Sequence, residues 1–366
     1  MKVCHLTTAH RPGDVRIYHK ECQSLVKGGY DVILIAPKDD SFKPESIKYI
    51  PLKKRNNRLS RLFFSPVELF FKTFKTKAKL FHFHDPELIP IGVMLKLFGK
   101  KVIYDAHENY SGQILAKHWL GNKFIRKSIS LIFRFFEKVS SLFFNGIITV
   151  TPEIARLFQE KKTTVISNYP ILSVIDDYKP DKKLNEKPVI IFSGGIDRMR
   201  GIREIIQAMD GLDKDAELRL MGPWESDEFK EECKTLQGWT KVVDMGVIPF
   251  GEHYKYMKMA DIGIINYYPL PNHVDALPNK PFEYMACYLP LIMSNFDKWK
   301  DYFNDVALFV DPMNASEISA AVNKYLDNPE EMKSTGSRAN EIVMKNYSWE
   351  SEQKKLLAFY KNVLKV

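Results

Sequence analysis

Apolar and polar residues alternate along the chain in blocks that predict strands followed by helices. Apolar runs at 3–7, 31–36, 80–83, 101–104 and 146–150 have the length of strands, and helical spacing is present at 17–27, 88–98 and 123–144. The first helix stops at Gly28-Gly29, as helices with a glycine C-terminus do. Strands that alternate with helices are joined by right-handed crossovers, so the pattern predicts a doubly wound parallel sheet.

The pattern starts again after a polar, proline-containing segment. Strands are predicted at 189–193, 217–221, 242–245, 262–265, 291–294 and 307–310, with helices between them. The sequence therefore predicts two α/β domains, 1–170 and 188–346, joined by a linker at 171–187 and facing each other across a cleft. Ligands of open α/β sheets bind at the carboxyl ends of the strands, so the loops after 6, 83, 104, 192 and 265 are expected to line that cleft.

Composition and charge narrow the possible partners. The chain has 366 residues, 45% of them hydrophobic and 27% charged, and its four cysteines lie far apart. No apolar stretch reaches the roughly 18 residues of a membrane-spanning helix, and no secretory signal is recognisable, so we expect a cytoplasmic protein. Residues 1–180 carry 30 Lys and Arg against 16 Asp and Glu, whereas the remainder carries 24 against 29. The basic first half predicts an anionic partner.

A glycine-containing loop follows the first strand of the second domain. Residues 193–201 include Gly194, Gly195, Arg200 and Gly201, and a helix follows. Backbone amides near glycines, a helix N-terminus and an arginine can together bind a phosphate. An ordinary strand–helix turn with surface arginines fits the spacing equally well. The loop matches neither dinucleotide-binding nor P-loop patterns.

Two carboxylates and a lysine precede a later helix of the same domain. Asp275 and Glu283 are eight residues apart, with Asn279 and Lys280 between them. Carboxylates accept hydrogen bonds from sugar or ribose hydroxyls, and lysine binds phosphate. The alternative is that Glu283 is an acid of the first helical turn, where acids are favoured.

Histidines and aromatics in the first domain also leave two readings open. His82 and His84 share a strand face, which would allow a metal pair, but packing is the interpretation we favour. Basic residues are interleaved with phenylalanines at 53–79 and 123–144. Such segments are typical of an anionic membrane surface or nucleic acid, but they also fit helices with aromatics in the core. No nucleic-acid-binding motif accompanies them, so no nucleic-acid partner is expected.

Six motifs occur in order along nearly the whole chain, at 8–17, 84–88, 104–108, 194–201, 260–263 and 277–285. Together they resemble the retaining GT-B-fold glycosyltransferases of family 4, in particular bacterial enzymes of capsule, O-antigen and exopolysaccharide assembly. It implies the GT-B fold, with two Rossmann-like domains. It also implies that the first domain binds the acceptor, that the second binds the nucleotide sugar, and that a C-terminal helix at 347–366 crosses back to the first.

The resemblance also implies roles for single residues. A UDP- or GDP-sugar would be bound by Gly194, Gly195, Gly201, Asn279 and Glu283, with Arg200, Lys280, His84 and Asp275 as the catalytic group. The acceptor candidates are Asp14, Arg16 and His107. Two positions depart from the family pattern: Asp275 replaces the usual Glu, and Gly195 stands where many members carry Arg.

The expected activity is hexosyl transfer with retention in cell-surface polysaccharide biosynthesis, without a cofactor and without a metal. The acceptor is expected to be a saccharide or a polyprenyl-linked saccharide, with peripheral attachment to the inner face of the cell membrane. Two alternatives stay open on the same scaffold: a UDP-sugar epimerase, and a peripheral membrane or scaffold protein without catalysis.

Overall fold

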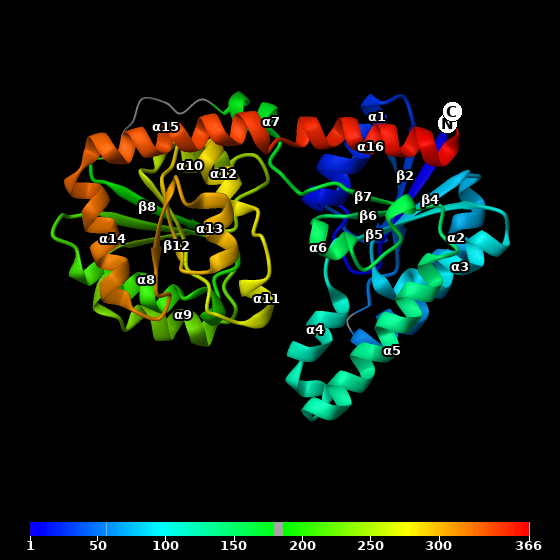
Figure 1. Ribbon diagram of the computed structural model, residues 1–366, viewed down its shortest axis with the longest axis horizontal. Helices are drawn as coiled ribbons and strands as arrows, with labels where there is room; N and C mark the ends of the chain where they lie inside the picture. The colour runs from blue at the N-terminus through cyan, green and yellow to red at the C-terminus, as the bar shows by residue number, and fades with distance from the viewer. Residues whose placement is uncertain (56, 179–185, 366) are drawn as a thin grey trace. The chain divides into compact units, whose positions relative to one another are not determined.

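A computed structural model describes residues 1–55, 57–178 and 186–365. The chain divides into two compact units (Figure 1). Unit 1 comprises Met1–Asn168 together with Trp349–Val366, and unit 2 comprises Tyr169–Ser348. Unit 1 therefore contains both ends of this sequence.

Unit 1 is built on a parallel sheet of seven strands. Their order is β3-β2-β1-β4-β5-β6-β7, and every pairing is parallel. The strands are β1 (Lys2–Leu6), β2 (Asp31–Pro37), β3 (Lys48–Leu52), β4 (Leu80–Phe83), β5 (Lys101–Ala106), β6 (Gly146–Thr149) and β7 (Thr163–Val165). The parallel doubly wound sheet is thus confirmed, with β3 and β7 as edge strands that the hydrophobic pattern did not predict.

Helices cover both faces of this sheet. One face buries an apolar core in which Leu6, Phe81 and Tyr104 from the strands contact Leu69 and Leu95 from helices. The other face lies under η1, α1 and α16, which contact one another. The helices are η1 (Val15–Cys22), α1 (Gln23–Lys27), α2 (Arg58–Thr76), η2 (Pro86–Leu88), α3 (Ile89–Leu97), α4 (Tyr110–Ala116), η3 (His118–Leu120), α5 (Lys123–Ser141), α6 (Pro152–Ala155), η4 (Glu160–Lys162) and α16 (Trp349–Leu364).

Unit 2 is built on a second parallel sheet, of six strands. Their order is β10-β9-β8-β11-β12-β13. The strands are β8 (Val189–Ser193), β9 (Glu217–Met221), β10 (Val242–Gly246), β11 (Ile262–Ile265), β12 (Leu291–Ser294) and β13 (Ala307–Val310). All six follow the strands that the hydrophobic runs predicted.

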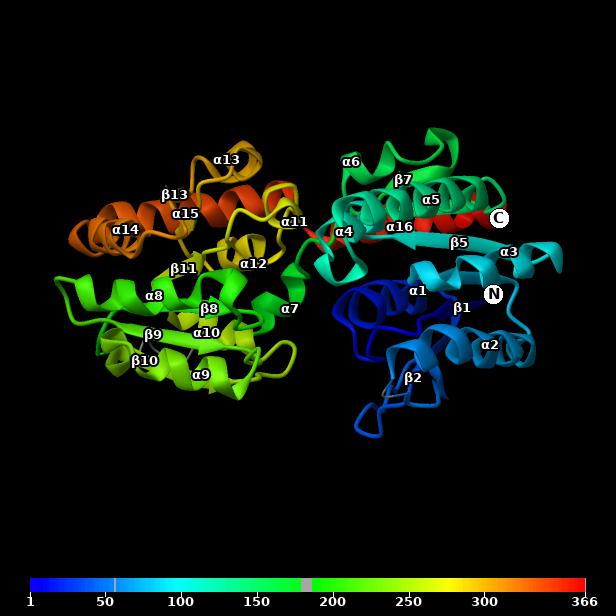
Figure 2. The ribbon, with the colours of Figure 1, turned by 90° about the horizontal axis from the view of Figure 1, so that it is seen from below.

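The alternation of side chains along β8 divides the core of unit 2 into two halves. Val189 and Ile191 pack on one face of the sheet against α7, α10, α12, α13 and α15, whereas Ile190 and Phe192 pack on the other against α8, α9 and α14. Figure 2 gives a second view of these layers. The helices are α7 (Leu172–Asp177), η5 (Arg198–Arg200), α8 (Ile202–Ala208), η6 (Met209–Gly211), α9 (Asp227–Lys234), η7 (Gln237–Lys241), α10 (His253–Met259), α11 (Pro271–Val274), α12 (Lys280–Ala286), α13 (Asp297–Phe303), α14 (Ala315–Asp327) and α15 (Pro329–Asn346).

The segment 171–187, expected as a linker, begins with α7. This helix packs on the core of unit 2 through Leu172 and Ile175. Residues 179–185 of the segment lie outside the described residues. Among the described helices, none has the length and apolar character that crossing a membrane would need.

Candidate functional site

Apart from His107, which follows β5, the candidate residues of both units follow strands at which the strand order reverses. In unit 1, β2 lies on one side of β1 and β4 on the other, so the order reverses between β1 and β4. In unit 2, β9 and β11 flank β8 in the same way, so the order reverses between β8 and β11. The loops that leave two such neighbouring strands diverge, which opens a crevice at the carboxyl edge of the sheet. The loops after β1, β4, β8 and β11 therefore have the positions that ligand-binding loops take in open α/β sheets.

In unit 2 the loop after β8 is held in one conformation by its own side chains. Asp197 accepts a hydrogen bond from the Arg200 amide at 3.0 Å, which closes the short helix η5. Gly194 has φ +149° and Gly201 has φ +57°, a left-handed conformation that favours glycine. A Cβ atom at Gly201 would also lie 2.3 Å from Asn266 Nδ2. Gly201 is therefore required both by its dihedral angle and by the close approach of the β11 loop.

Arg200 is oriented within this loop on three sides. Its Nε lies 3.2 Å from Asp197 Oδ2, and its Nη1 donates to the Gly195 carbonyl at 3.3 Å. The guanidinium also lies 5.2 Å from the centre of the Tyr267 ring. About a third of the side chain is exposed. Arg200 is thus both fixed in direction and accessible, as a phosphate-binding arginine must be.

Tyr267 joins the Arg200 loop to the loop that carries Asp275. Its ring packs 5.1 Å from the ring of His273 in α11, directly before Asp275. Asp275 itself is exposed, and its carbonyl accepts a hydrogen bond from Lys298 Nζ at 2.7 Å. Sequence reasoning missed Tyr267, and an aromatic residue two positions beyond the predicted strand 262–265 was the available signal.

Lys280 and Glu283 form a close ion pair at the start of α12. Lys280 Nζ lies 2.5 Å from Glu283 Oε2, and His253 Nε2 lies 3.4 Å from the same oxygen. Burial alone would raise the pKa of Glu283, but Lys280 and His253 outweigh it and lower that pKa to about 2. Glu283 is therefore a carboxylate at neutral pH and can accept hydrogen bonds from hydroxyl groups. Asn279 is partly buried and directly precedes this helix.

In unit 1, Asp14 and His10 form an ion pair in the loop after β1. Asp14 Oδ1 accepts hydrogen bonds from the amides of Arg16 and Ile17 and so caps η1, while its Oδ2 lies 3.4 Å from His10 Nδ1. Burial alone would lower the pKa of His10, but the hydrogen bond to Asp14 and the charge of Asp85 raise it to about 9. His10 is therefore protonated at neutral pH, and it was missed as a site residue.

Asp85 holds this loop against the end of β4. One of its oxygens accepts hydrogen bonds from the Thr7 hydroxyl at 2.8 Å and from the Thr8 amide at 2.6 Å. The other oxygen lies 3.4 Å from His10 Nε2. The acidic residue after His84 thus organises the loop, which the sequence alone did not indicate.

The other unit 1 candidates differ in exposure. Arg16 is buried and forms a two-point ion pair with Asp105, with Nε and Nη2 at 2.9 and 3.1 Å from its two oxygens. His84 is fully buried, and its ring nitrogens lie 3.0 Å from His5 and 3.2 Å from Asp105. His107 is partly exposed, and its ring packs 5.2 Å from that of His10. The structure therefore groups Asp14 and His107 around His10, and it buries Arg16 and His84 behind them.

Two family models match the chain, one in each unit. Residues 13–169 match the family described as Glycosyltransferase Family 4, and residues 174–342 match the family described as Glycosyl transferases group 1. No curated protein matches the chain by sequence. The roles expected for the individual site residues stay predictions.

Solved structures share the fold over the full length of the chain. Sucrose-phosphate synthase from Thermosynechococcus elongatus superposes with a TM-score of 0.76 at 18% identity, covering 100% of this chain and 99% of that one. HepE of Anabaena in complex with UDP-glucose superposes with a TM-score of 0.75 at 13% identity, covering 99% of both chains. WaaG, a glycosyltransferase involved in lipopolysaccharide biosynthesis, superposes with a TM-score of 0.72 at 13% identity, covering 98% of both. With a glycosyltransferase family matched in each unit and this fold throughout, the chain is a GT-B-fold glycosyltransferase.

Proposed function

We propose that the protein transfers a hexose from a UDP- or GDP-sugar to a saccharide or polyprenyl-linked saccharide, with retention, in cell-surface polysaccharide biosynthesis. The observation that carries this proposal is the oriented, accessible Arg200 at the strand-order reversal of unit 2, in the same unit as the Lys280–Glu283 pair. The bound UDP-glucose of HepE and the lipopolysaccharide pathway of WaaG support it.

In this proposal unit 2 binds the nucleotide sugar. Arg200 and Lys280 neutralise the diphosphate, and Glu283 accepts hydrogen bonds from the ribose hydroxyls. Gly194, Gly195 and Gly201 let the backbone come close to the phosphates. Asn279 adds a polar contact beside α12, and Asp275 accepts a hydrogen bond from the sugar. Lys280 would exchange part of its contact with Glu283 for the diphosphate.

The reaction we propose keeps the configuration of the anomeric carbon. The bond from the anomeric carbon to the phosphate oxygen breaks, and its electron pair remains on the nucleoside diphosphate. The acceptor hydroxyl oxygen then bonds to the same face of that carbon, and its proton passes to the leaving phosphate oxygen. Catalysis is then electrostatic stabilisation of the leaving group by Arg200 and Lys280, which requires neither a protein base nor a metal ion.

Unit 1 would bind the acceptor through Asp14, His107 and the protonated His10. Arg16 and His84 would support this surface from behind, because both are buried. The basic and aromatic segments of unit 1 would lie against the anionic inner face of the membrane.

The exposure of the aromatics supports this membrane contact. Phe63, Phe71, Phe124 and Phe135 are each more than 65% exposed, so these side chains are not part of the core. Figure 1 shows α5 extending with α4 beyond the sheet of unit 1. Of these phenylalanines, Phe124 and Phe135 lie on α5, and Phe63 and Phe71 lie on α2. The exposed basic residues of α5 are Lys123, Lys127, Arg134 and Lys138.

Exchanging two of these phenylalanines should weaken membrane binding. We expect the wild-type protein to co-sediment with phosphatidylglycerol vesicles at low salt and less at high salt, because surface charges are screened. Phe124→Ser with Phe135→Ser removes apolar area that would enter the interface, so vesicle affinity should fall about tenfold.

The matched control is Met313→Ser with Met344→Ser, which removes two exposed apolar side chains from unit 2. This variant should sediment as the wild type does. Sedimentation of the phenylalanine variant at the wild-type level, or no binding of the wild type at low salt, would contradict the membrane contact.

The activity itself is tested by the release of UDP or GDP from a panel of nucleotide sugars. We expect release from one donor only, increased by a lipid-linked saccharide extract and unchanged by enough EDTA to remove free Mg²⁺ and Mn²⁺. Interconversion of the donor without acceptor-dependent release would indicate the epimerase. Nucleotide-sugar binding with neither reaction would indicate a protein that kept the fold without turnover.

A further inference from the structure

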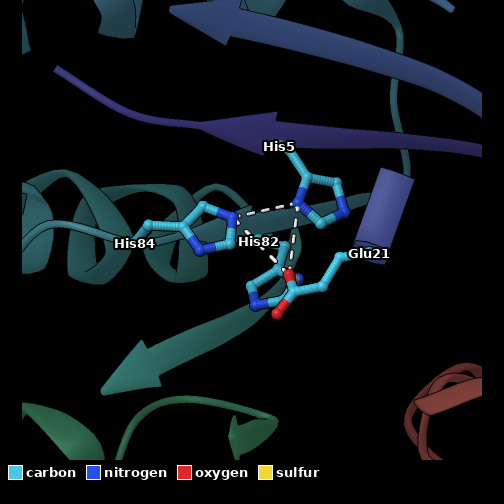
Figure 3. Close-up of side chains that lie close together, drawn as sticks. All are labelled: His5, Glu21, His82 and His84. Atoms are coloured by element: carbon cyan, nitrogen blue, oxygen red, sulfur yellow. Dashed lines mark hydrogen bonds and ion pairs between the residues drawn. The ribbon is translucent and has the colours of Figure 1, made fainter. Parts of the chain in front are cut away.

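Three histidines and a glutamate lie together under η1 and α16, inside unit 1. His5 and His82 are register partners on the adjacent strands β1 and β4, and His84 follows two positions after His82 on the same face. Glu21 reaches them from η1, and Figure 3 shows its carboxylate directed toward the rings. All four side chains are fully buried.

The facing atoms have the separations of a ligand set. His5 Nδ1 lies 3.0 Å from His84 Nε2, and Glu21 Oε2 lies 3.8 Å from the former and 3.9 Å from the latter. His82 Nδ1 lies 3.7 Å from the same oxygen, and one atom from each residue falls within 4.8 Å of the others. Ligands at about 2.0–2.1 Å from a tetrahedral zinc ion are about 3.3 Å apart, so small shifts would complete the set.

The carboxylate at the centre of this cluster lacks hydrogen bonds. Neither oxygen of Glu21 accepts one from any described residue, although Arg16 Nη2 lies 3.2 Å from Oε1 as an ion pair. A buried carboxylate without hydrogen bonds is costly. A divalent cation bound to the Glu21 oxygens would provide the partner that these oxygens lack.

The outer nitrogens of two rings are held as they are in metal-binding histidines. His84 Nδ1 lies 3.2 Å from Asp105 Oδ2, and His5 Nε2 lies 3.2 Å from the Tyr360 hydroxyl. Such partners fix the tautomer and aim the other nitrogen at the metal. Those other nitrogens, His5 Nδ1 and His84 Nε2, are the two that face each other. The Tyr360 hydroxyl also lies 2.7 Å from His82 Nδ1. A bond from His82 Nδ1 to the metal would replace this contact.

We propose that His5, Glu21, His82 and His84 bind one divalent transition metal ion of the zinc class. Three imidazoles and one carboxylate are a donor set that suits tetrahedral zinc. The ion would tie η1 to β1 and β4, and its role would be structural, separate from the metal-independent transfer proposed above. A second cluster of His84, Asp105 and His107 is less suitable, because both oxygens of Asp105 already bind Arg16.

The experiment measures zinc in the full chain after expression in zinc-supplemented medium and gel filtration. We expect about one equivalent per chain, with X-ray absorption showing nitrogen and oxygen ligands and no sulfur. Addition of zinc to chelator-treated protein should raise the melting temperature. Less than a tenth of an equivalent, with no effect of added zinc on melting, would overturn the proposal in favour of a hydrogen-bonded network with a protonated Glu21.

Variants separate this site from adventitious zinc. Glu21→Gln keeps the shape of the side chain and removes its charge, so zinc affinity should fall at least about a hundredfold. His82→Gln is the second test if the first variant does not fold. His19→Gln is the matched control, since His19 lies on η1 outside the cluster. A folded Glu21→Gln or His82→Gln protein with full zinc content would also overturn the proposal.

Discussion

Arg200→Ala is expected to lower kcat/KM for sugar transfer by about a hundredfold or more. The leaving diphosphate gains negative charge in the transition state, and a fixed cation stabilises that charge more than it stabilises the bound donor. Arg200 is fixed by Asp197, the Gly195 carbonyl and the Tyr267 ring. Steady-state kinetics with the donor found in the release assay measure this effect.

Arg198→Ala is the matched control for this prediction. Arg198 lies two residues away, is more exposed, and pairs with Glu232. It has no proposed contact with the donor, so its removal should leave kcat/KM within about twofold. Near-normal turnover of the Arg200→Ala protein, or equal losses in both variants, would refute the role of Arg200.

The second large effect is expected on stability. Asp105→Asn should reduce the free energy of unfolding by about 3–5 kcal/mol, because it removes the charge of the two-point ion pair that holds the buried guanidinium of Arg16 and leaves only the single contact with Glu21. Burial alone would raise the pKa of Asp105, but Arg16 outweighs it and holds that pKa well below the usual value. Ionised Asp105 therefore adds its full amount to the free energy of unfolding above its unfolded pKa near 3.8, and this stabilisation is lost as the pH falls below that value.

Urea unfolding at neutral pH measures the Asp105→Asn effect. Asp213→Asn is the control, since Asp213 is exposed and should change stability by less than about 0.5 kcal/mol. If both variants lower the free energy of unfolding by the same small amount, the Arg16–Asp105 ion pair does not stabilise unit 1 as its geometry indicates.

The hydrophobic pattern predicted most strands because buried parallel strands are short, continuous apolar runs. It failed at β3 and β7 for two different reasons. Pro51 interrupts β3, which an edge strand tolerates and an inner strand does not. β7 has three residues, Thr163–Val165, none of them fully buried, so no apolar run marks it.

The loops of the candidate site were predictable, but the burial of their side chains was not. The sequence locates His84 and Asp105 at the ends of strands, and alternation gives the face on which each side chain lies. It does not show what covers that face. Here the cover comes from Glu21 on η1 and Tyr360 on α16, residues 339 positions apart in the sequence.

The exposure of the α5 aromatics illustrates the same limit. Helical spacing fixes which side chains share a stripe, but not whether the stripe meets another element or solvent. Ser130 and Ser140 of α5 are buried, whereas Phe124 and Phe135 are exposed. The buried residues of α5 are all polar: Ser130, Glu137, Ser140 and Ser141. Helical spacing alone could not reveal that this side of the helix faces inward.

The position of α16 has a consequence for biosynthesis. Trp349 donates a hydrogen bond to Ser24, and Tyr360 contacts His5 and His82, so α16 completes a face of unit 1. A ribosome makes the strands of unit 1 first and α16 only after the whole of unit 2. During synthesis this face of unit 1 therefore stays uncovered until α16 is made, and apolar surface exposed in this way is prone to aggregation.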